Sequence, residues 1–93
     1  MQFQWDKAKA SGNLLRHGID FADAATSFDD DRALTIPDPD VVHQERFLTL
    51  AMDASGRVLV TAWTGREDSI RLISVRKASA GERHRYSSRR KGD

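Results

Sequence analysis

The spacing of apolar residues changes from helical to strand-like at Arg46, and this change limits the chain to an α+β fold. Between residues 7 and 28 the apolar side chains recur every three or four positions, whereas after Arg46 they alternate and are rich in β-branched types. Helices grouped before strands are typical of an α+β domain with an antiparallel sheet. We expect residues 1–93 to form one domain.

Two short helices are predicted in the first third of the chain. Asp6 is a good N-cap for a helix over residues 7–17, and Gly18 offers a left-handed stop. Gly12 weakens the interior of this helix by roughly 1 kcal/mol relative to alanine. Asp20 then caps a second helix. Its apolar face would hold Phe21, Ala24, Ala25 and Phe28.

Three strands are predicted after this helical part, with loops short enough for antiparallel hairpins. Their ranges are 46–52, 58–63 and 69–75. A short strand over 33–36 precedes an acidic loop with two prolines, and Ser79 with Glu82 forms a capping box that starts a last helix. Residues 87–93 are expected to fray. The fold class is therefore two N-terminal helices packed on a twisted antiparallel sheet with a C-terminal helix.

Composition and charge exclude several classes of protein. The chain has no cysteine, so disulfides and thiolate metal sites are excluded, and its apolar runs are too short to span a membrane. Nothing marks it for export, so we expect a cytoplasmic domain. Residues 1–45 carry a net charge of −5 and residues 46–93 carry +6. This asymmetry favours a basic face suited to phosphate or an acidic protein, although an ordinary dipolar surface has the same charges.

The residues that could carry chemistry are mostly arginines. His17, His43 and His84 lie at no metal-site spacing, and we expect neither a metal nor a cofactor. Arginine presents a planar fork of donors that matches phosphate. The alternative to phosphate binding is a structural role, in which the arginines pair with acidic residues or lie on an exposed face of the sheet. The candidates are Arg66, Arg71, Arg76, Arg83 and Arg85, together with Glu82, Tyr86 and Trp63.

Several short stretches over residues 3–86 have a specific order and spacing, although none is diagnostic alone. In the N-terminal part they are Phe3-Gln4-Trp5-Asp6, Lys9, Asn13-Leu14, His17-Gly18, Phe21, Ala24-Ala25 and Phe28-Asp29. In the C-terminal part they are Glu45-Arg46-Phe47, residues 56–60, Thr64-Gly65-Arg66, residues 71–78, Glu82-Arg83 and Tyr86. Together they resemble the BrnT family of bacterial toxins, in the RelE/ParE-like group of type II toxin–antitoxin systems. Ser11 and Gly12 stand where alanines are usual.

The resemblance implies a ribonuclease that arrests translation and is neutralised by a ribbon-helix-helix antitoxin of the BrnA type. In the family, toxin and antitoxin form a heterotetramer whose antitoxin part binds operator DNA. The implied RelE-like fold agrees with the fold predicted from the residues. Two other classes remain open, a non-catalytic basic RNA-binding module and a purely partner-binding protein.

With this resemblance, residue roles can be assigned as expectations. A metal-independent ribonuclease needs a base for the ribose 2′-hydroxyl, charge stabilisation in the transition state and an acid for the leaving 5′-oxygen. We expect Arg71 and Arg76 to clamp the phosphate, and Glu82 or Tyr86 to transfer a proton. His17 is the alternative base. The expected RNA-binding residues are Arg66, Arg83, Arg85 and Trp63.

Overall fold

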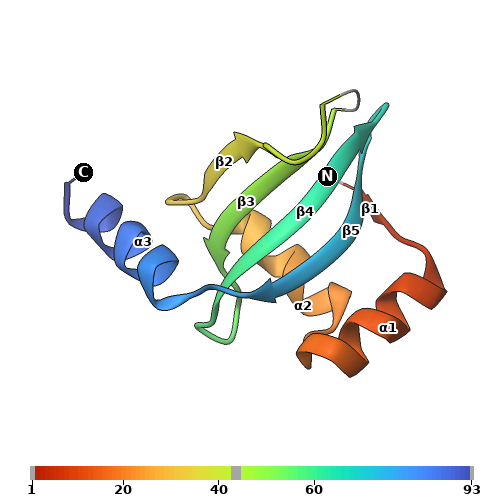
Figure 1. Ribbon diagram of the computed structural model, residues 1–93, viewed down its shortest axis with the longest axis horizontal. Helices are drawn as coiled ribbons and strands as arrows, with labels where there is room; N and C mark the ends of the chain where they lie inside the picture. Colours follow the sequence, from red (N-terminus) through yellow and green to blue (C-terminus); the bar gives the residue numbers. More distant parts are fainter. Residues whose placement is uncertain (1, 43–44, 93) are drawn as a thin grey trace.

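The computed structural model shows a twisted five-stranded sheet with helices on both faces (Figure 1). It describes residues 2–42 and 45–92, with the side chains of 89–92 left out. The elements are β1 (Gln2–Gln4), α1 (Lys7–His17), α2 (Phe21–Thr26), the 3-10 turn η1 (Ser27–Asp29), β2 (Leu34–Pro37), β3 (Phe47–Met52), β4 (Val58–Arg66), β5 (Ser69–Lys77) and α3 (Ala80–Gly92).

Both N-terminal helices begin as their sequences predict, and α1 also ends at the predicted residue. The Asp6 carboxylate accepts from the backbone N–H of Ala8, and Gly18 ends α1 with a φ of 71°. The Asp20 carboxylate caps α2 in the same way. One difference is that α2 ends at Thr26, so Phe28 lies in η1.

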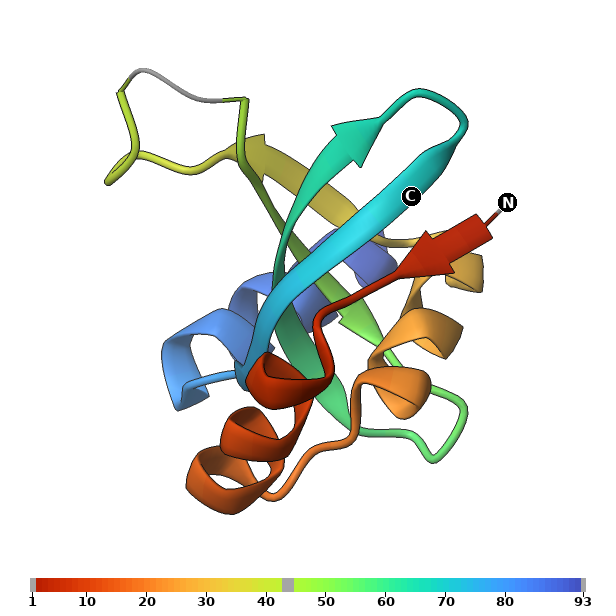
Figure 2. The ribbon, with the colours of Figure 1, turned by 90° about the vertical axis from the view of Figure 1, so that its right-hand side faces the viewer.

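The antiparallel meander of β3, β4 and β5 is confirmed, and β2 joins it as an antiparallel edge strand. The expectation of a purely antiparallel sheet is wrong, because β1 pairs with β5 in parallel (Figure 2). The sheet is therefore mixed, with the order β1-β5-β4-β3-β2. With three residues, β1 is too short to show an alternation in the sequence, so no strand is predicted there.

A register shift between Ala62 and Trp63 explains why β5 looks apolar on both faces. Ala62 pairs with Ser74 while Trp63 pairs with Leu72, so Ile73 is an extra residue on β5. The bulge lets Leu72 and Val75 face the same side although they are three positions apart. Both belong to one apolar cluster.

The two faces of the sheet carry separate cores. Against α1 and α2 lies the larger one, which is built from Ile19, Phe21, Ala24, Leu59, Ile70, Leu72 and Val75. On the opposite face a smaller core combines Leu50, Val60, Ala78 and Tyr86. α3 leads away from the sheet, so it covers this second face only in part (Figure 1).

The last helix starts at the predicted capping box. The Glu82 carboxylate accepts from the Ser79 N–H at 2.8 Å, and the Ser79 hydroxyl accepts from the Glu82 N–H at 3.2 Å. The helix continues through residues 87–92, where fraying was expected, and Asp93 lies outside the described residues. Over residues 2–42 and 45–92, no helix has the length and apolarity needed to cross a membrane.

Candidate active site

A cavity of about 230 Å³ lies over the part of the sheet that α3 leaves open. Its floor follows one row of the register, because Leu48 pairs with Ala62 and Ala62 pairs with Ser74. Ala62 and Ser74 are small, so the strands leave a hollow between larger side chains. We call this space the sheet cavity. Its lining residues are His17, Asp38, Asp40, Arg46, Leu48, Val60, Ala62, Ser74, Val75 and Arg76.

His17 reaches the sheet cavity because a buried asparagine fixes the end of α1 against β5. Asn13 is 1% exposed, and its side-chain oxygen accepts from the backbone N–H of Val75 at 3.0 Å. Its amide donates to the carbonyl of Ile19 at 3.2 Å, just past the helix end. His17 lies one helical turn after Asn13, which places it beside the strand that carries Arg76.

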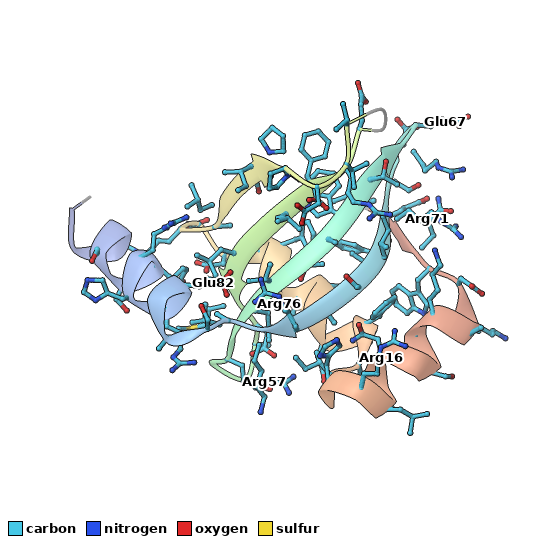
Figure 3. The ribbon with its side chains drawn as sticks, in the orientation of Figure 1. Arg16, Arg57, Glu67, Arg71, Arg76 and Glu82 are labelled. Carbon is cyan, nitrogen blue, oxygen red and sulfur yellow. The ribbon has the colours of Figure 1, made fainter. Side chains whose placement is uncertain are left out.

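Arg76 and Glu82 form a bidentate pair at the border of the sheet cavity (Figure 3). Arg76 Nη1 donates to Glu82 Oε1 at 2.7 Å and Nη2 donates to Oε2 at 3.0 Å. Glu82 also caps α3, so a single carboxylate joins the start of the helix to the guanidinium. The arrangement fixes the orientation of an arginine whose side chain is 45% exposed.

The charge state of this pair is set by its hydrogen bonds. The side-chain hydrogen bond from Arg76 is the main cause that lowers the pKa of Glu82 to about 2. The same bond raises the pKa of Arg76. Glu82 is therefore a carboxylate at neutral pH and has no proton to donate to a leaving group.

Tyr86 lies on the same helix but does not line the sheet cavity. Its side chain is 3% exposed and its hydroxyl donates to Asp30 Oδ2. The same carboxylate oxygen accepts from the backbone N–H of Met52, at the end of β3. This contact anchors α3 to the sheet and leaves the hydroxyl away from the cavity.

Three further predicted residues lie at a distance from Arg76 along the hairpin. Arg71 is near the other end of β5, where its Nη1 donates to Gln4 Oε1 at 3.3 Å (Figure 3). Arg66 lines a separate hollow at the hairpin tip, together with Glu67 and Asp68. Trp63 packs against the larger core and donates its indole N–H to the Thr49 hydroxyl at 2.7 Å. The structure does not bring Arg66 and Trp63 to the sheet cavity.

The two remaining arginines leave α3 in different directions. Arg83 donates to the carbonyl of Ala78 and lines a hollow with Arg57 and Lys77. Arg85 lines a small apolar groove over β2 and β3 that adjoins the sheet cavity. The basic residues of the C-terminal half are thus spread over several parts of the surface, because the bulge, the hairpin and the helix each turn them differently.

Three residues that build this site were not expected from the sequence. Arg46, Ser74 and Asn13 lie within the stretches that carry the family resemblance, but no role was assigned to them. The signal that could have been used is Asn13 four residues before His17 on one helix face. Within the described parts of the chain, no three histidine or acidic side chains are placed to hold a metal ion; His43 lies outside those parts.

The geometry defines a small α+β domain whose half-covered sheet holds a cavity lined by a histidine, two arginines and two aspartates. Residues 5–82 match the family described as the ribonuclease toxin, BrnT, of type II toxin–antitoxin systems. The chain belongs to this family of ribonuclease toxins, which confirms the resemblance found in the sequence.

A comparison with solved structures agrees with this assignment at the level of the fold. The chain is similar to the crystal structure of the Brucella abortus ribonuclease toxin BrnT, with a TM-score of 0.67 and 23% sequence identity. The similarity covers 85% of this chain and 97% of the other. No curated protein matches the chain. The predicted α+β fold class is confirmed.

Proposed function

We propose that this ribonuclease toxin cleaves RNA in the sheet cavity, by a reaction that needs no metal ion, and thereby inhibits translation. The observation that carries the proposal is that His17 and Arg76 line the same cavity. An imidazole can accept and donate a proton, and a guanidinium keeps a permanent positive charge. These are two of the three functions that such a reaction requires.

The proposed reaction is a transfer of the phosphate within the RNA. His17 takes the proton of a ribose 2′-hydroxyl, whose oxygen attacks the adjacent phosphorus while the bond to the 5′-oxygen breaks. The products are a 2′,3′-cyclic phosphate and a 5′-hydroxyl, whose oxygen takes its proton from water as it leaves. Arg76 stabilises the additional charge on the phosphate oxygens, and Glu82 orients Arg76. The other charged groups that line the cavity are Asp38, Asp40 and Arg46.

Arg71 and Arg66 are proposed to contact the RNA on one side of the reacting phosphate, toward the tip of the hairpin of β4 and β5. Arg71 follows Ile70, which faces the larger core, so alternation along the strand turns Arg71 toward the face of the sheet cavity. Its position at the far end of β5 suits a neighbouring phosphate. Contacts of this kind position the chain and carry no sequence information.

The proposed partner is a BrnA-like ribbon-helix-helix antitoxin, in a cytoplasmic heterotetramer that binds operator DNA through the antitoxin. The apolar groove beside Arg85 is lined by Leu34, Ile36, Leu48 and Leu50, and Ile36 is 42% exposed. Leu48 and Val60 line both the groove and the sheet cavity. An antitoxin segment on the groove would therefore also cover the RNA site.

Two experiments test the reaction. Expression of the toxin alone should stop growth and degrade cellular RNA, whereas co-expression with the product of the neighbouring gene should restore both. Purified toxin should cleave RNA equally well with and without EDTA and leave cyclic phosphate ends. Loss of cleavage in EDTA would contradict metal independence, and binding without cleavage would support the RNA-binding module instead.

Competition tests the proposed position of the antitoxin. A non-cleavable RNA, with 2′-O-methyl riboses, is titrated against purified antitoxin on the same toxin. We expect each to displace the other. Simultaneous binding at full affinity would show that inhibition acts away from the sheet cavity.

A further inference from the structure

Arg46 is held at the border of the sheet cavity by the backbone of two strands. Its carbonyl accepts from the N–H of Asp38 at 2.8 Å, and the next residue, Phe47, pairs with Pro37 of β2. The side chain therefore starts from a fixed point at the beginning of β3. It enters the cavity from the side opposite β5, which carries Arg76.

The guanidinium of Arg46 has no partner among the described residues. Its Nε is buried and makes no hydrogen bond, and the ion pairs of the described chain do not include it. Arg57, in contrast, is paired with Asp23 and Asp53, and Arg76 is paired with Glu82. A buried charged donor without an acceptor is costly, so an acceptor from outside the chain would be favourable there.

The position of Arg46 complements that of Arg76. Arg46 directly precedes β3 and Arg76 lies on β5, two strand spacings away across the sheet. Arg76 pairs with Val60, and Val60 pairs with Leu50, so Arg46 is also displaced by four residues along the strands, and the two backbones are about 16 Å apart. Arginine side chains can cross much of this distance from each side. Between them lies the floor of small residues, Ala62 and Ser74, which leaves room for a phosphate group.

The hydrogen bonds of Arg76 leave a role for a second arginine. Arg76 uses three donor contacts within the chain, two to Glu82 and one to the carbonyl of Lys77. Arginine has five N–H donors, so only two are left for a ligand. Arg46 still has its full fork, the geometry that binds phosphate through two parallel bonds.

We infer that Arg46 binds a phosphate group of the RNA in the sheet cavity, opposite Arg76. This inference rests on the proposed function and adds a phosphate-binding residue to it. Asp38 and Asp40 line the same cavity, and neither forms an ion pair with Arg46 in the described chain. The two carboxylates lower the net charge of the cavity, while the Arg46 guanidinium supplies the specific donors for the anion.

The test is the salt dependence of binding to a 2′-O-methyl RNA oligonucleotide. Each phosphate contact that is lost should reduce the slope of log K against log salt by about 0.7 for single strands. We expect Arg46→Gln to reduce the slope by this amount and to weaken binding roughly tenfold. Arg46→Lys should keep the slope and lose part of the affinity, because lysine retains the charge without the fork.

Arg16→Gln is the matched control, since it removes the same charge from the exposed surface of α1 outside the cavity lining (Figure 3). It should leave the slope unchanged. Thermal unfolding distinguishes a role of Arg46 in RNA binding from a role in folding, because Arg46→Gln should not lower the melting temperature. An unchanged slope for Arg46→Gln, in a toxin that binds RNA, would overturn the inference alone. A wild-type toxin that neither binds nor cleaves RNA would overturn the proposed function with it.

Discussion

The two faces of the sheet differ in what covers them. On the face toward α1 and α2, Phe21 and Ile19 are fully buried, and aromatic rings of Phe3, Phe28 and Trp63 pack edge to face. The other face has a small core only at the end where α3 crosses it, and beyond that core lies the sheet cavity.

If RNA is cleaved in the sheet cavity as proposed, one face of this 93-residue chain supplies stability and the other supplies the reaction. A small domain has little apolar surface to bury, and here one face supplies most of it. The other face can then remain open and carry charged groups around a cavity. Substitutions on the first face should act on folding, and substitutions on the second should act on RNA.

The largest effect is expected for Phe21→Ala on the face of the sheet that α1 and α2 cover, here called the closed face; the face with the sheet cavity is the open face. Removal of a fully buried phenylalanine costs about 3–5 kcal/mol of unfolding free energy, a large share of the stability of a small domain. The comparison variant is Leu48→Ala, which lies half-buried in the floor of the sheet cavity and should cost less than about 2 kcal/mol. Urea unfolding of both variants measures the difference. Equal losses would show that the two faces share the stability.

Arg76→Ala should have the next largest effect, on cleavage. Loss of one group that stabilises charge in the transition state reduces the rate by about 10²–10³. Arg71→Ala should reduce it by only about tenfold, because Arg71 lies outside the cavity lining. Initial rates on one RNA substrate, with far-UV circular dichroism as the folding control, compare the two. Equal losses would place Arg71 at the reacting phosphate as well.

Much of the fold could be predicted from the sequence because local signals agree with the tertiary structure. Asp6, Gly18 and Asp20 end or begin helices through contacts within a few residues, and the Ser79–Glu82 box does the same. The parallel pairing of β1 depends on a contact between Gln2–Gln4 and β5, more than 60 residues away in the chain. No local pattern indicates such a pairing.

The candidate site could be predicted less well, because the type of a residue does not reveal to which face of the sheet its side chain points. Arg76 is expected from the sequence to clamp the phosphate, and it lines the cavity. Trp63 is expected to bind RNA, but it packs against the larger core. The bulge at Ile73 decides which residues of β5 face the cavity. It results from pairing with β4 and has no signature in β5 alone.

Tyr86→Phe should affect stability and leave cleavage unchanged per folded molecule. The hydroxyl donates to the carboxylate of Asp30, and a hydrogen bond to a charged group contributes about 1.5–3 kcal/mol. The loss should therefore appear in thermal unfolding. A slower cleavage rate, in a variant shown to be folded, would instead assign Tyr86 to proton transfer. Phe28→Leu, on the closed face, is a control for a change of stability alone.

The smallest effect concerns the pH dependence of stability near Arg76. The pKa of Glu82 is about 2 in the folded chain, below its ordinary value of 4.5. The unfolded chain therefore binds more protons between these values, so the contribution of the pair is complete above about pH 4.5 and is lost as the pH falls toward 2. Because 45% of the Arg76 side chain is exposed, water and salt screen the pair, and we expect only about 0.2–1 kcal/mol.

Glu82→Gln isolates this contribution, since glutamine can still close the capping box with Ser79. At pH 7 the variant should be slightly less stable than the wild type, and the difference should vanish on acidification from pH 4.5 to 2. Arg76→Gln should remove the same pH-dependent difference, and the double variant should add nothing further. Chemical unfolding at several pH values gives the curves. A difference that persists at pH 2 would mean that Glu82 stabilises α3 through its cap alone, and that the orientation of Arg76 on the open face does not depend on it.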